Sequence, residues 1–235
     1  MAATRLPGKP LLKINDLSII SHVFKKAEET KIGKVVVAAE DQEILDDVKK
    51  NGGHGILTNK NHKTGTDRIY EAYKKLDLKN IDYILNLQGD EPNIDKKDII
   101  NLNNLAVKNN SEIGTLAAKI KDNQMLINQN VVKVETEKNL EKDNFSKAIN
   151  FSRDNLLNLN NNIYHHIGIY LYQVNVLEKF VSLSQTKNEM QNKLEQFRAL
   201  DNDLKISVAL AESSPIGVDT EEDYLAIKKI MEYKR

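Results

Sequence analysis

Two carboxylates directly follow a short apolar run near the middle of the chain, in Gln88-Gly89-Asp90-Glu91-Pro92. The run, residues 81–85, is short and rich in branched side chains, which predicts a buried strand. In an open α/β sheet, ligands bind beyond the carboxyl ends of strands, so a carboxylate there can hold a hard cation against a phosphate. A Gly-Asp turn is also common as a purely structural feature, with Asp90 capping the turn and Pro92 ending the strand.

Two cations lie close to the amino end of the chain. Arg5 and Lys9 flank the Pro7-Gly8 turn, which lets backbone amides and an ammonium group converge on one side of a tight loop. This arrangement suits a triphosphate. The GxxxxGK[ST] spacing of a P-loop is missing, and an exposed basic leader is the alternative interpretation.

A small-residue segment, Thr64-Gly65-Thr66, precedes the helical pattern of residues 69–76. Either threonine can cap that helix, whose free N–H groups then face the sheet edge. A helix start is the default interpretation of such a segment. The functional interpretation adds that these residues are small enough for a flat base or a phosphate to approach the backbone.

A third acidic position lies near the carboxyl end of the chain. Thr220 and Asp223 form a capping box that accounts for the start of the last helix. Asp219 is not needed for that cap. It is therefore a candidate for a second metal carboxylate, distant from Asp90 in sequence but free to lie beside it in space.

The elements that must position these residues alternate between strand and helix in the first half of the chain. Alternation of this kind predicts a mostly parallel, doubly wound sheet with right-handed crossovers. Later segments alternate between apolar and polar residues, as half-exposed antiparallel strands do. We predict one α/β domain over residues 1–235, with residues 131–172 as an antiparallel section. An amphipathic helix is expected over residues 188–200, and a polar connection without regular structure over residues 155–162.

Composition excludes several classes of function. The 34 basic and 34 acidic side chains give a formal net charge of zero, so the composition does not predict nonspecific electrostatic binding to nucleic acid. No cysteine is present, which removes disulfides, thiolate zinc sites and a cysteine nucleophile. None of the five histidines pairs at i, i+4, which argues against a histidine metal centre. With no apolar run of membrane-spanning length, we expect a cytoplasmic protein that contacts no membrane.

Seven motifs, taken in order, resemble those of the 3-deoxy-manno-octulosonate (KDO) cytidylyltransferases, or CMP-KDO synthetases. The resemblance spans nearly the whole chain, and it is the order of the motifs that makes it specific. The motifs are Thr4-Arg5-Leu6-Pro7-Gly8-Lys9-Pro10, His62-x-Thr64-Gly65-Thr66-Asp67-Arg68, Gln88-Gly89-Asp90-Glu91-Pro92, Phe151-Ser152-Arg153, His166-x-Gly168-Ile169-Tyr170, Leu194-Glu195-Gln196-x-Arg198 and Gly217-Val218-Asp219-Thr220.

The resemblance implies a Rossmann-like nucleotidyltransferase fold and a role for each matching residue. The CTP-binding residues would be Arg5, Lys9, Thr64, Gly65, Thr66 and Arg68. The sugar-acid pocket would contain Gln88, Arg153, His166, Tyr170, Glu195 and Gln196. Asp90 and Asp219 would hold Mg²⁺, which oxygen ligands favour over softer metals, and with Lys9 they would form the catalytic group. Arg68 or Arg153 is expected near the sugar carboxylate.

The implied reaction is attack of the anomeric hydroxyl of KDO on the α-phosphate of CTP, which gives CMP-KDO for lipopolysaccharide synthesis and pyrophosphate. Positioning and charge neutralisation would supply most of the acceleration. Two alternatives remain open: activation of a sialic-acid-like nonulosonate, and nucleotide binding without turnover. The resemblance also implies a homodimer, with the segments between Val131 and Tyr172 at its interface. The whole scheme requires Asp90 and Asp219 to lie together near Lys9.

Members of the resembled family begin with a short hydrophobic strand ending in a Pro-x-Arg turn, whereas here Met1 stands almost directly before the Thr4-Arg5 segment. Such a strand would be interior to the sheet, and each buried backbone group left unpaired costs roughly 1–3 kcal/mol. We therefore expect a form extended by this strand to melt at a higher temperature and turn over faster. Equal melting temperatures and equal turnover of the two forms would contradict this expectation.

Overall fold

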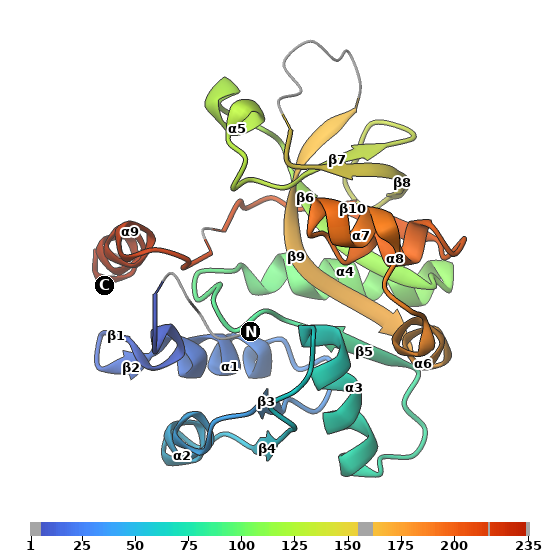
Figure 1. Ribbon diagram of the computed structural model, residues 1–235. Helices are drawn as coiled ribbons and strands as arrows, with labels where there is room; N and C mark the ends of the chain where they lie inside the picture. The colour runs from blue at the N-terminus through green and yellow to red at the C-terminus, as the bar shows by residue number, and fades with distance from the viewer. Residues whose placement is uncertain (1–5, 155–161, 216, 234–235) are drawn as a thin grey trace. The chain divides into compact units, whose positions relative to one another are not determined.

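The computed structural model describes residues 6–154, 162–215 and 217–233, which belong to two compact units (Figure 1). The first unit comprises residues 1–79, 87–97 and 215–235, and the second comprises residues 80–86 and 98–214. Two expectations fall outside the described residues: the placement of Arg5, and the polar connection at 155–162 apart from Asn162.

The described residues of the first unit form short strands, a 3-10 turn and four α-helices. Its elements are η1 (Lys9–Leu11), β1 (Lys13–Ile14), β2 (Leu17–Ser18), α1 (Ile19–Glu29), β3 (Val37–Ala39), α2 (Gln42–Lys50), β4 (Gly55–Leu57), α3 (Gly65–Leu76) and α9 (Glu221–Glu232). β3 and β4 pair in parallel, as the alternation of strand and helix predicts, and β1 pairs with β2 in an antiparallel hairpin. The expected strand at 34–39 is shorter than its apolar run, because only its last three residues pair.

Apolar side chains at helical spacing hold this unit together. Phe24 of α1 and Val48 of α2 pack with Val37 of β3 in one buried cluster. A second cluster joins residues from both ends of the chain, namely Ile14, Ile19, Val218 and Ile227. The capping box of Thr220 and Asp223 at the start of α9 is confirmed.

The second unit is built on a six-stranded sheet. Its elements are β5 (Tyr83–Asn86), α4 (Lys96–Asn109, which starts in the first unit), β6 (Ile113–Ala118), α5 (Asn123–Ile127), β7 (Lys133–Thr136), β8 (Phe145–Ser152), β9 (Ile163–Gln173), α6 (Val174–Ser182), α7 (Lys187–Asn192), α8 (Gln196–Leu200) and β10 (Ile206–Leu210). The strand order is β5-β9-β6-β10-β8-β7, and β7 also pairs with β9. Since β9 runs antiparallel to both β5 and β6, and β10 is parallel to β6, the strands β5, β6 and β10 share one direction.

Helices cover both faces of this sheet, as expected for an α/β fold (Figure 1). Gly114 of β6 faces α4, where an added Cβ would lie 3.1 Å from Leu102 Cδ1, so the helix approaches the strand closely. The neighbouring Ile113 points to the opposite face, because successive side chains of a strand alternate. There it lines a small cavity with Ala199 of α8.

The prediction of a single helix over residues 188–200 is wrong, because the structure has two short helices there. α7 ends at Asn192, Lys193 takes a left-handed φ of 53°, and α8 begins at Gln196. Arg198 of α8 turns back on Glu189 of α7 and pairs with it through two hydrogen bonds, of 2.9 and 2.5 Å. Both side chains are buried, so this paired charge is a tertiary contact that the helical periodicity does not reveal.

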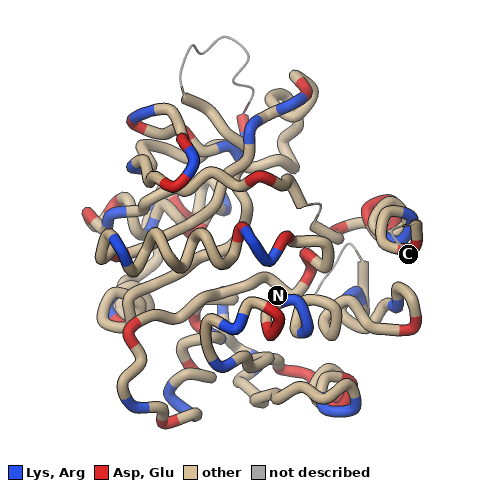
Figure 2. Tube along the Cα trace, turned by 180° about the vertical axis from the view of Figure 1, so that it is seen from behind, with Lys and Arg blue, Asp and Glu red and all other residues tan. Residues whose placement is uncertain are grey.

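Basic and acidic residues are interspersed along the trace of both units, and the first turn of α9 carries three consecutive acidic residues, Glu221, Glu222 and Asp223 (Figure 2). Within the described part of the chain, the longest apolar helical stretches fall short of what crossing a bilayer requires.

Candidate active site

Lys9 joins three segments of the first unit that are far apart in sequence. Gly8 adopts a left-handed φ of 70°, which turns the chain into η1 and directs the following lysine. The Lys9 Nζ atom donates to Asp90 Oδ2 at 2.7 Å and to Asp219 Oδ1 at 3.1 Å. It also donates to the Val218 carbonyl at 2.8 Å. The expected proximity of the two aspartates to each other and to Lys9 is therefore confirmed.

The backbone supports this arrangement independently of the lysine. The Val218 N–H donates to the Asp90 carbonyl at 2.9 Å, which holds the two acidic loops side by side. Asp90 follows β5 in the chain, and Asp219 immediately precedes the cap of α9. The two carboxylates are thus held by their loops as well as by the charge of Lys9.

The charges of this cluster favour a cation-binding role. Burial of the Lys9 ammonium works against its charge, but the carboxylates of Asp90 and Asp219 outweigh this effect, so the pKa of Lys9 is raised. Two carboxylates and one ammonium leave a net negative charge. The Asp90 side chain is 28% exposed and the Asp219 side chain 48%, so solutes can reach both.

The donor set fits Mg²⁺ better than a metal that needs a cage of protein ligands. Among the described residues, no group of three or more His, Cys, Asp or Glu side chains could hold a metal ion. Mg²⁺ is usually bound through one or two carboxylates, with water and substrate phosphate completing its shell. Asp90 and Asp219 therefore fit a magnesium ion that binds together with a phosphate ligand.

The start of α3 lies beside the segment that carries Asp90. Thr64 caps the helix by accepting from the Asp67 N–H at 3.2 Å, and Thr66 is buried. A Cβ added to Gly65 would stand 3.9 Å from Gln88 Nε2, so the glutamine amide is adjacent to the first turn. The uncapped N–H groups of a helix start are suited to an anionic or carbonyl ligand.

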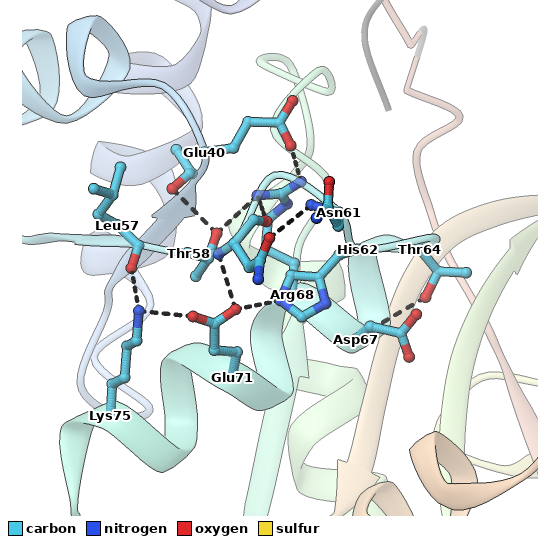
Figure 3. Close-up of polar contacts among 12 residues, drawn as sticks. Glu40, Leu57, Thr58, Asn61, His62, Thr64, Asp67, Arg68, Glu71 and Lys75 are labelled. Carbon is cyan, nitrogen blue, oxygen red and sulfur yellow. Dashed lines mark hydrogen bonds and ion pairs between the residues drawn. The ribbon is translucent and has the colours of Figure 1, made fainter.

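Arg68 is held by protein groups (Figure 3). Its guanidinium pairs with Glu40 and donates to Thr58 Oγ1 at 2.7 Å. The Arg68 side chain is only 11% exposed. The contact of Arg68 with a substrate carboxylate stays a prediction. In this structure the carboxylate that pairs with Arg68 is that of Glu40.

In the second unit, His166 is buried and hydrogen-bonded. Its Nε2 atom lies 3.0 Å from Thr115 Oγ1, and its ring packs edge-on against Phe151. Because the Thr115 hydroxyl donates to the Ile169 carbonyl at 2.7 Å, Nε2 must carry the proton. Burial, then the charges of His165 and Arg153, lower the pKa of His166 to about 3.

Tyr170, Glu195 and Gln196 come together on the α8 side of the sheet. They line a cavity of about 10 Å³, which is about the space that one water molecule needs. The Tyr170 hydroxyl is buried there beside the polar side chains of Gln196 and Thr115, but forms no hydrogen bond of good geometry with the described residues. Burial, then the neighbouring Tyr172 and Glu195, raise its pKa well above the usual value. The three residues are adjacent, but this cavity is too small for a sugar.

Arg153 stabilises a turn next to β7. Its Nη1 atom donates to the carbonyls of Gln129 and Asn130, both at 3.2 Å. The buried Lys133 ammonium donates at 3.0 Å to the Arg153 carbonyl and to two carbonyls of the same turn. Burial lowers the pKa of Lys133. The proposed contact of Arg153 with the sugar carboxylate stays a prediction.

The candidate residues form one group in each unit. The group in the first unit comprises Lys9, Thr64, Gly65, Thr66, Arg68, Gln88, Asp90 and Asp219. The group in the second unit comprises Arg153, His166, Tyr170, Glu195 and Gln196.

Sequence reasoning missed several residues that support these groups. Thr115 contacts His166, Glu40 pairs with Arg68, and Glu189 pairs with Arg198. Glu71 was also missed, although its spacing from Arg68 and Lys75 places all three on one face of α3. That spacing is the one signal in the sequence that could have identified it.

Comparison with known proteins agrees with this geometry. Residues 1–206 match the family model described as cytidylyltransferase. A 3-deoxy-manno-octulosonate cytidylyltransferase of Thermodesulfovibrio yellowstonii is 42% identical over 97% of this chain and 94% of its own length. One of the same name from Rhodopseudomonas palustris (strain BisB5) is 42% identical over 95% and 91%.

Solved structures extend the likeness to the fold. A CMP:2-keto-3-deoxy-manno-octonic acid synthetase complexed with CTP superposes with a TM-score of 0.88 at 29% identity, covering 99% of this chain and 95% of that chain. A UDP-glucose pyrophosphorylase complexed with UDP-glucose reaches a TM-score of 0.74 at 14% identity, covering 100% and 96%. At that identity the second likeness concerns the fold alone, which is of the nucleotidyltransferase type.

The lowered pKa of His166 predicts a pH-dependent loss of stability. The folded protein keeps the imidazole neutral down to about pH 3, whereas the unfolded chain takes up a proton below about pH 6.5. Stability therefore falls as the pH drops below 6.5, by about 1.4 kcal/mol for this group at pH 5.5. In His166→Gln, we expect the fall in melting temperature between pH 7.5 and 5.5 to be smaller by about 3–6 °C. Equal falls in both proteins would contradict the burial of a neutral ring.

Proposed function

The chain belongs to the cytidylyltransferase family, and from this premise we propose that it transfers CMP from CTP to 3-deoxy-manno-octulosonate and releases pyrophosphate. The observation that carries the proposal is the convergence of Asp90 and Asp219 on Lys9. The names of the relatives supply the sugar acid, and the CTP bound to the structural neighbour supplies the nucleotide. The product, CMP-KDO, would serve lipopolysaccharide synthesis.

The reaction is limited by repulsion between two anions. The anomeric oxygen of the sugar acid forms a bond to the α-phosphorus of CTP, while the bond from that phosphorus to the bridging oxygen of the β-phosphate breaks. The proton of the anomeric hydroxyl passes to solvent water, and pyrophosphate leaves with the electron pair of the broken bond. No covalent intermediate on the protein is needed, so the enzyme must position both substrates and offset their charge.

Lys9 offsets part of that charge. Its raised pKa keeps it fully charged at neutral pH, and it also offsets the repulsion between the carboxylates of Asp90 and Asp219. Those carboxylates would hold Mg²⁺, which when bound neutralises the phosphate oxygens. The N–H groups at the start of α3, beside Gly65 and Gln88, would bind the nucleotide.

For the sugar acid, we propose the residues around Tyr170, and binding there requires their cavity of about 10 Å³ to widen. Tyr170, Glu195 and Gln196 already lie together and offer a hydroxyl, a carboxylate and an amide to a polyhydroxylated ligand. The buried Tyr170 hydroxyl supports this role, because it makes no hydrogen bond of good geometry to its neighbours Gln196 and Thr115, and such a group costs free energy unless a ligand or water satisfies it. His166 would contribute through the same packed cluster, since its ring lies 5.4 Å from that of Tyr170.

We also propose that the enzyme acts as a homodimer in the cytoplasm. The antiparallel section is the part of the chain proposed for the dimer interface. Ile149 of β8, in that section, is 51% exposed although it is apolar, which supports a contact there. A cytoplasmic location fits a protein that uses CTP and has no cysteine.

The proposal is tested by measuring pyrophosphate release from CTP and Mg²⁺ with each of two sugar acids. We expect release with 3-deoxy-manno-octulosonate and at least tenfold lower kcat/KM with a nine-carbon nonulosonate. A preference for the nonulosonate would assign a different sugar. A rise in melting temperature with CTP, but no pyrophosphate with either acid, would contradict group transfer and leave only nucleotide binding.

Removing the carboxylate of Asp90 should slow the chemical step. For Asp90→Ala we expect turnover at saturating substrates to fall at least about a hundredfold, equivalent to roughly 2.7 kcal/mol of barrier, because metal-borne charge is lost. The matched control is Asp95→Ala, since Asp95 lies in the same connection but accepts from the Lys97 N–H instead of contacting Lys9. Turnover of Asp90→Ala within a few-fold of the parent would mean that Asp90 only shapes the turn.

A further inference from the structure

Side chains on one face of α3 contact residues 58–63, the connection between β4 and the start of this helix (Figure 3). Arg68 and Glu71 are three residues apart and Glu71 and Lys75 four apart, so all three side chains project from the same side of the helix. Residues 58–63 pass along that side between β4 and the cap of α3. Arg68 and Glu71, which we call the α3 clamp, both contact this connection.

Glu71 binds the connection at two points. Its Oε2 atom accepts from the Asn59 N–H at 2.9 Å and pairs with His62 Nε2. Its Oε1 atom pairs with Lys75 at 2.7 Å. Hydrogen bonds from Lys75, then from the Asn59 N–H and His62, lower the pKa of Glu71 to about 2. The carboxylate is therefore ionised throughout the working range of an enzyme.

Arg68 forms a hydrogen bond with Thr58, the first residue of the same connection. Its Nη1 atom donates to Thr58 Oγ1 at 2.7 Å, and its Nη2 atom pairs with Glu40. Thr58 in turn donates to the Ala39 carbonyl, through its N–H at 2.9 Å and its hydroxyl at 3.1 Å. Arg68 thus links α3 to the ends of both β3 and β4.

These contacts set where α3 begins. The clamp holds Thr58, Asn59 and His62, and the helix cap at Thr64 follows two residues after His62. A connection held at three points cannot shift without moving the cap and the first turn. Small displacements of groups that orient a substrate are costly to binding and catalysis.

The same contacts argue against a direct ligand role for Arg68. To reach a substrate anion, its guanidinium would have to leave Glu40, whose side chain is only 22% exposed. The carboxylate of Glu40 would then remain partly buried without its charged partner, which is unfavourable. Glu40, at the end of β3, therefore supplies an internal carboxylate for the guanidinium.

We propose that Arg68 and Glu71 are positioning residues of the nucleotide site, which act by holding residues 58–63 so that the start of α3 meets CTP. The inference rests on the proposed function for the identity of the nucleotide. It differs from the resemblance in the role of Arg68, which acts through Glu40 and Thr58 instead of touching substrate. Loss of the clamp weakens CTP binding and leaves the sugar acid site unchanged.

The first test compares Glu40→Gln, Arg68→Met and the exchange Glu40→Arg/Arg68→Glu in the full chain. CTP affinity is measured by calorimetry without the sugar acid, and KM and kcat are measured with both substrates. We expect both single variants to raise the Kd and KM for CTP about tenfold, with kcat within about threefold and an unchanged KM for the sugar acid. The exchange should restore at least half of the lost affinity on a logarithmic scale, because it rebuilds the ion pair in reverse.

A direct ligand role for Arg68 gives a different pattern. Glu40→Gln would then bind CTP like the parent, Arg68→Met alone would lose affinity or raise the KM for the sugar acid, and the exchange would rescue nothing. Three results would each overturn the proposal: CTP binding by Glu40→Gln that equals the parent's, a raised KM for the sugar acid in Arg68→Met, or no rescue by the exchange. If instead the parent releases no pyrophosphate, the proposed function fails, while the calorimetric comparison of CTP affinities still decides the role of the clamp.

The second test addresses Glu71 through its two partners. Glu71→Gln and His62→Ala should each raise the Kd for CTP by about fivefold to tenfold, and His62 lies on the connection, where its loss does not disturb the core. Lys74→Met is the matched control, because Lys74 is an exposed lysine of the same helix that lies next to Lys75 in the chain, whereas Lys75 itself donates to the Leu57 carbonyl at 2.7 Å. We expect its Kd to stay within twofold of the parent. Equal effects of all three variants, or none, would contradict positioning by Glu71.

Discussion

The ion cluster of Lys9 with Asp90 and Asp219 is the constraint on which the first unit depends. Two like charges brought into adjacent loops repel each other, and the Lys9 ammonium offsets that repulsion with bonds of 2.7 and 3.1 Å. The hydrogen bond from the Val218 N–H to the Asp90 carbonyl and the cluster of Ile14, Ile19, Val218 and Ile227 hold the same segments through neutral contacts. The acidic pair is thus kept ready for a cation by both polar and apolar contacts.

The second unit places its polar groups inside a packed sheet by pairing them. Lys133 is held by three carbonyls, Glu189 and Arg198 pair with each other, and His166 pairs with Thr115. Buried polar groups cost free energy unless they are paired in this way. The buried Tyr170 hydroxyl is the exception among the described residues of this sheet, because it meets its polar neighbours Gln196 and Thr115 without a hydrogen bond of good geometry.

Helix caps and short strands were predictable because their signals are local. Thr64 caps α3, and Thr220 and Asp223 form the capping box of α9. The strand expected at 81–85 forms over Tyr83–Asn86, but it is not the buried strand predicted, because it stands at one end of the strand order and only Asn86 of it is buried. The expected helix over 188–200 was wrong because Lys193 takes a left-handed conformation and Arg198 finds Glu189 across the break. A helical pattern of apolar residues does not register an ion pair between two short helices.

The sequence alone determined the alternation of elements, the α/β class and, through the order of its motifs, the family, because these depend on residue type and spacing along the chain. Only the tertiary structure decided which charges meet. It brought Asp219 to Lys9 across a separation of 210 residues, and it gave Arg68 the carboxylate of Glu40 as its partner. The reason is physical: the energy of a charged group depends on its distance to other charges and on its burial, and both are properties of the folded chain.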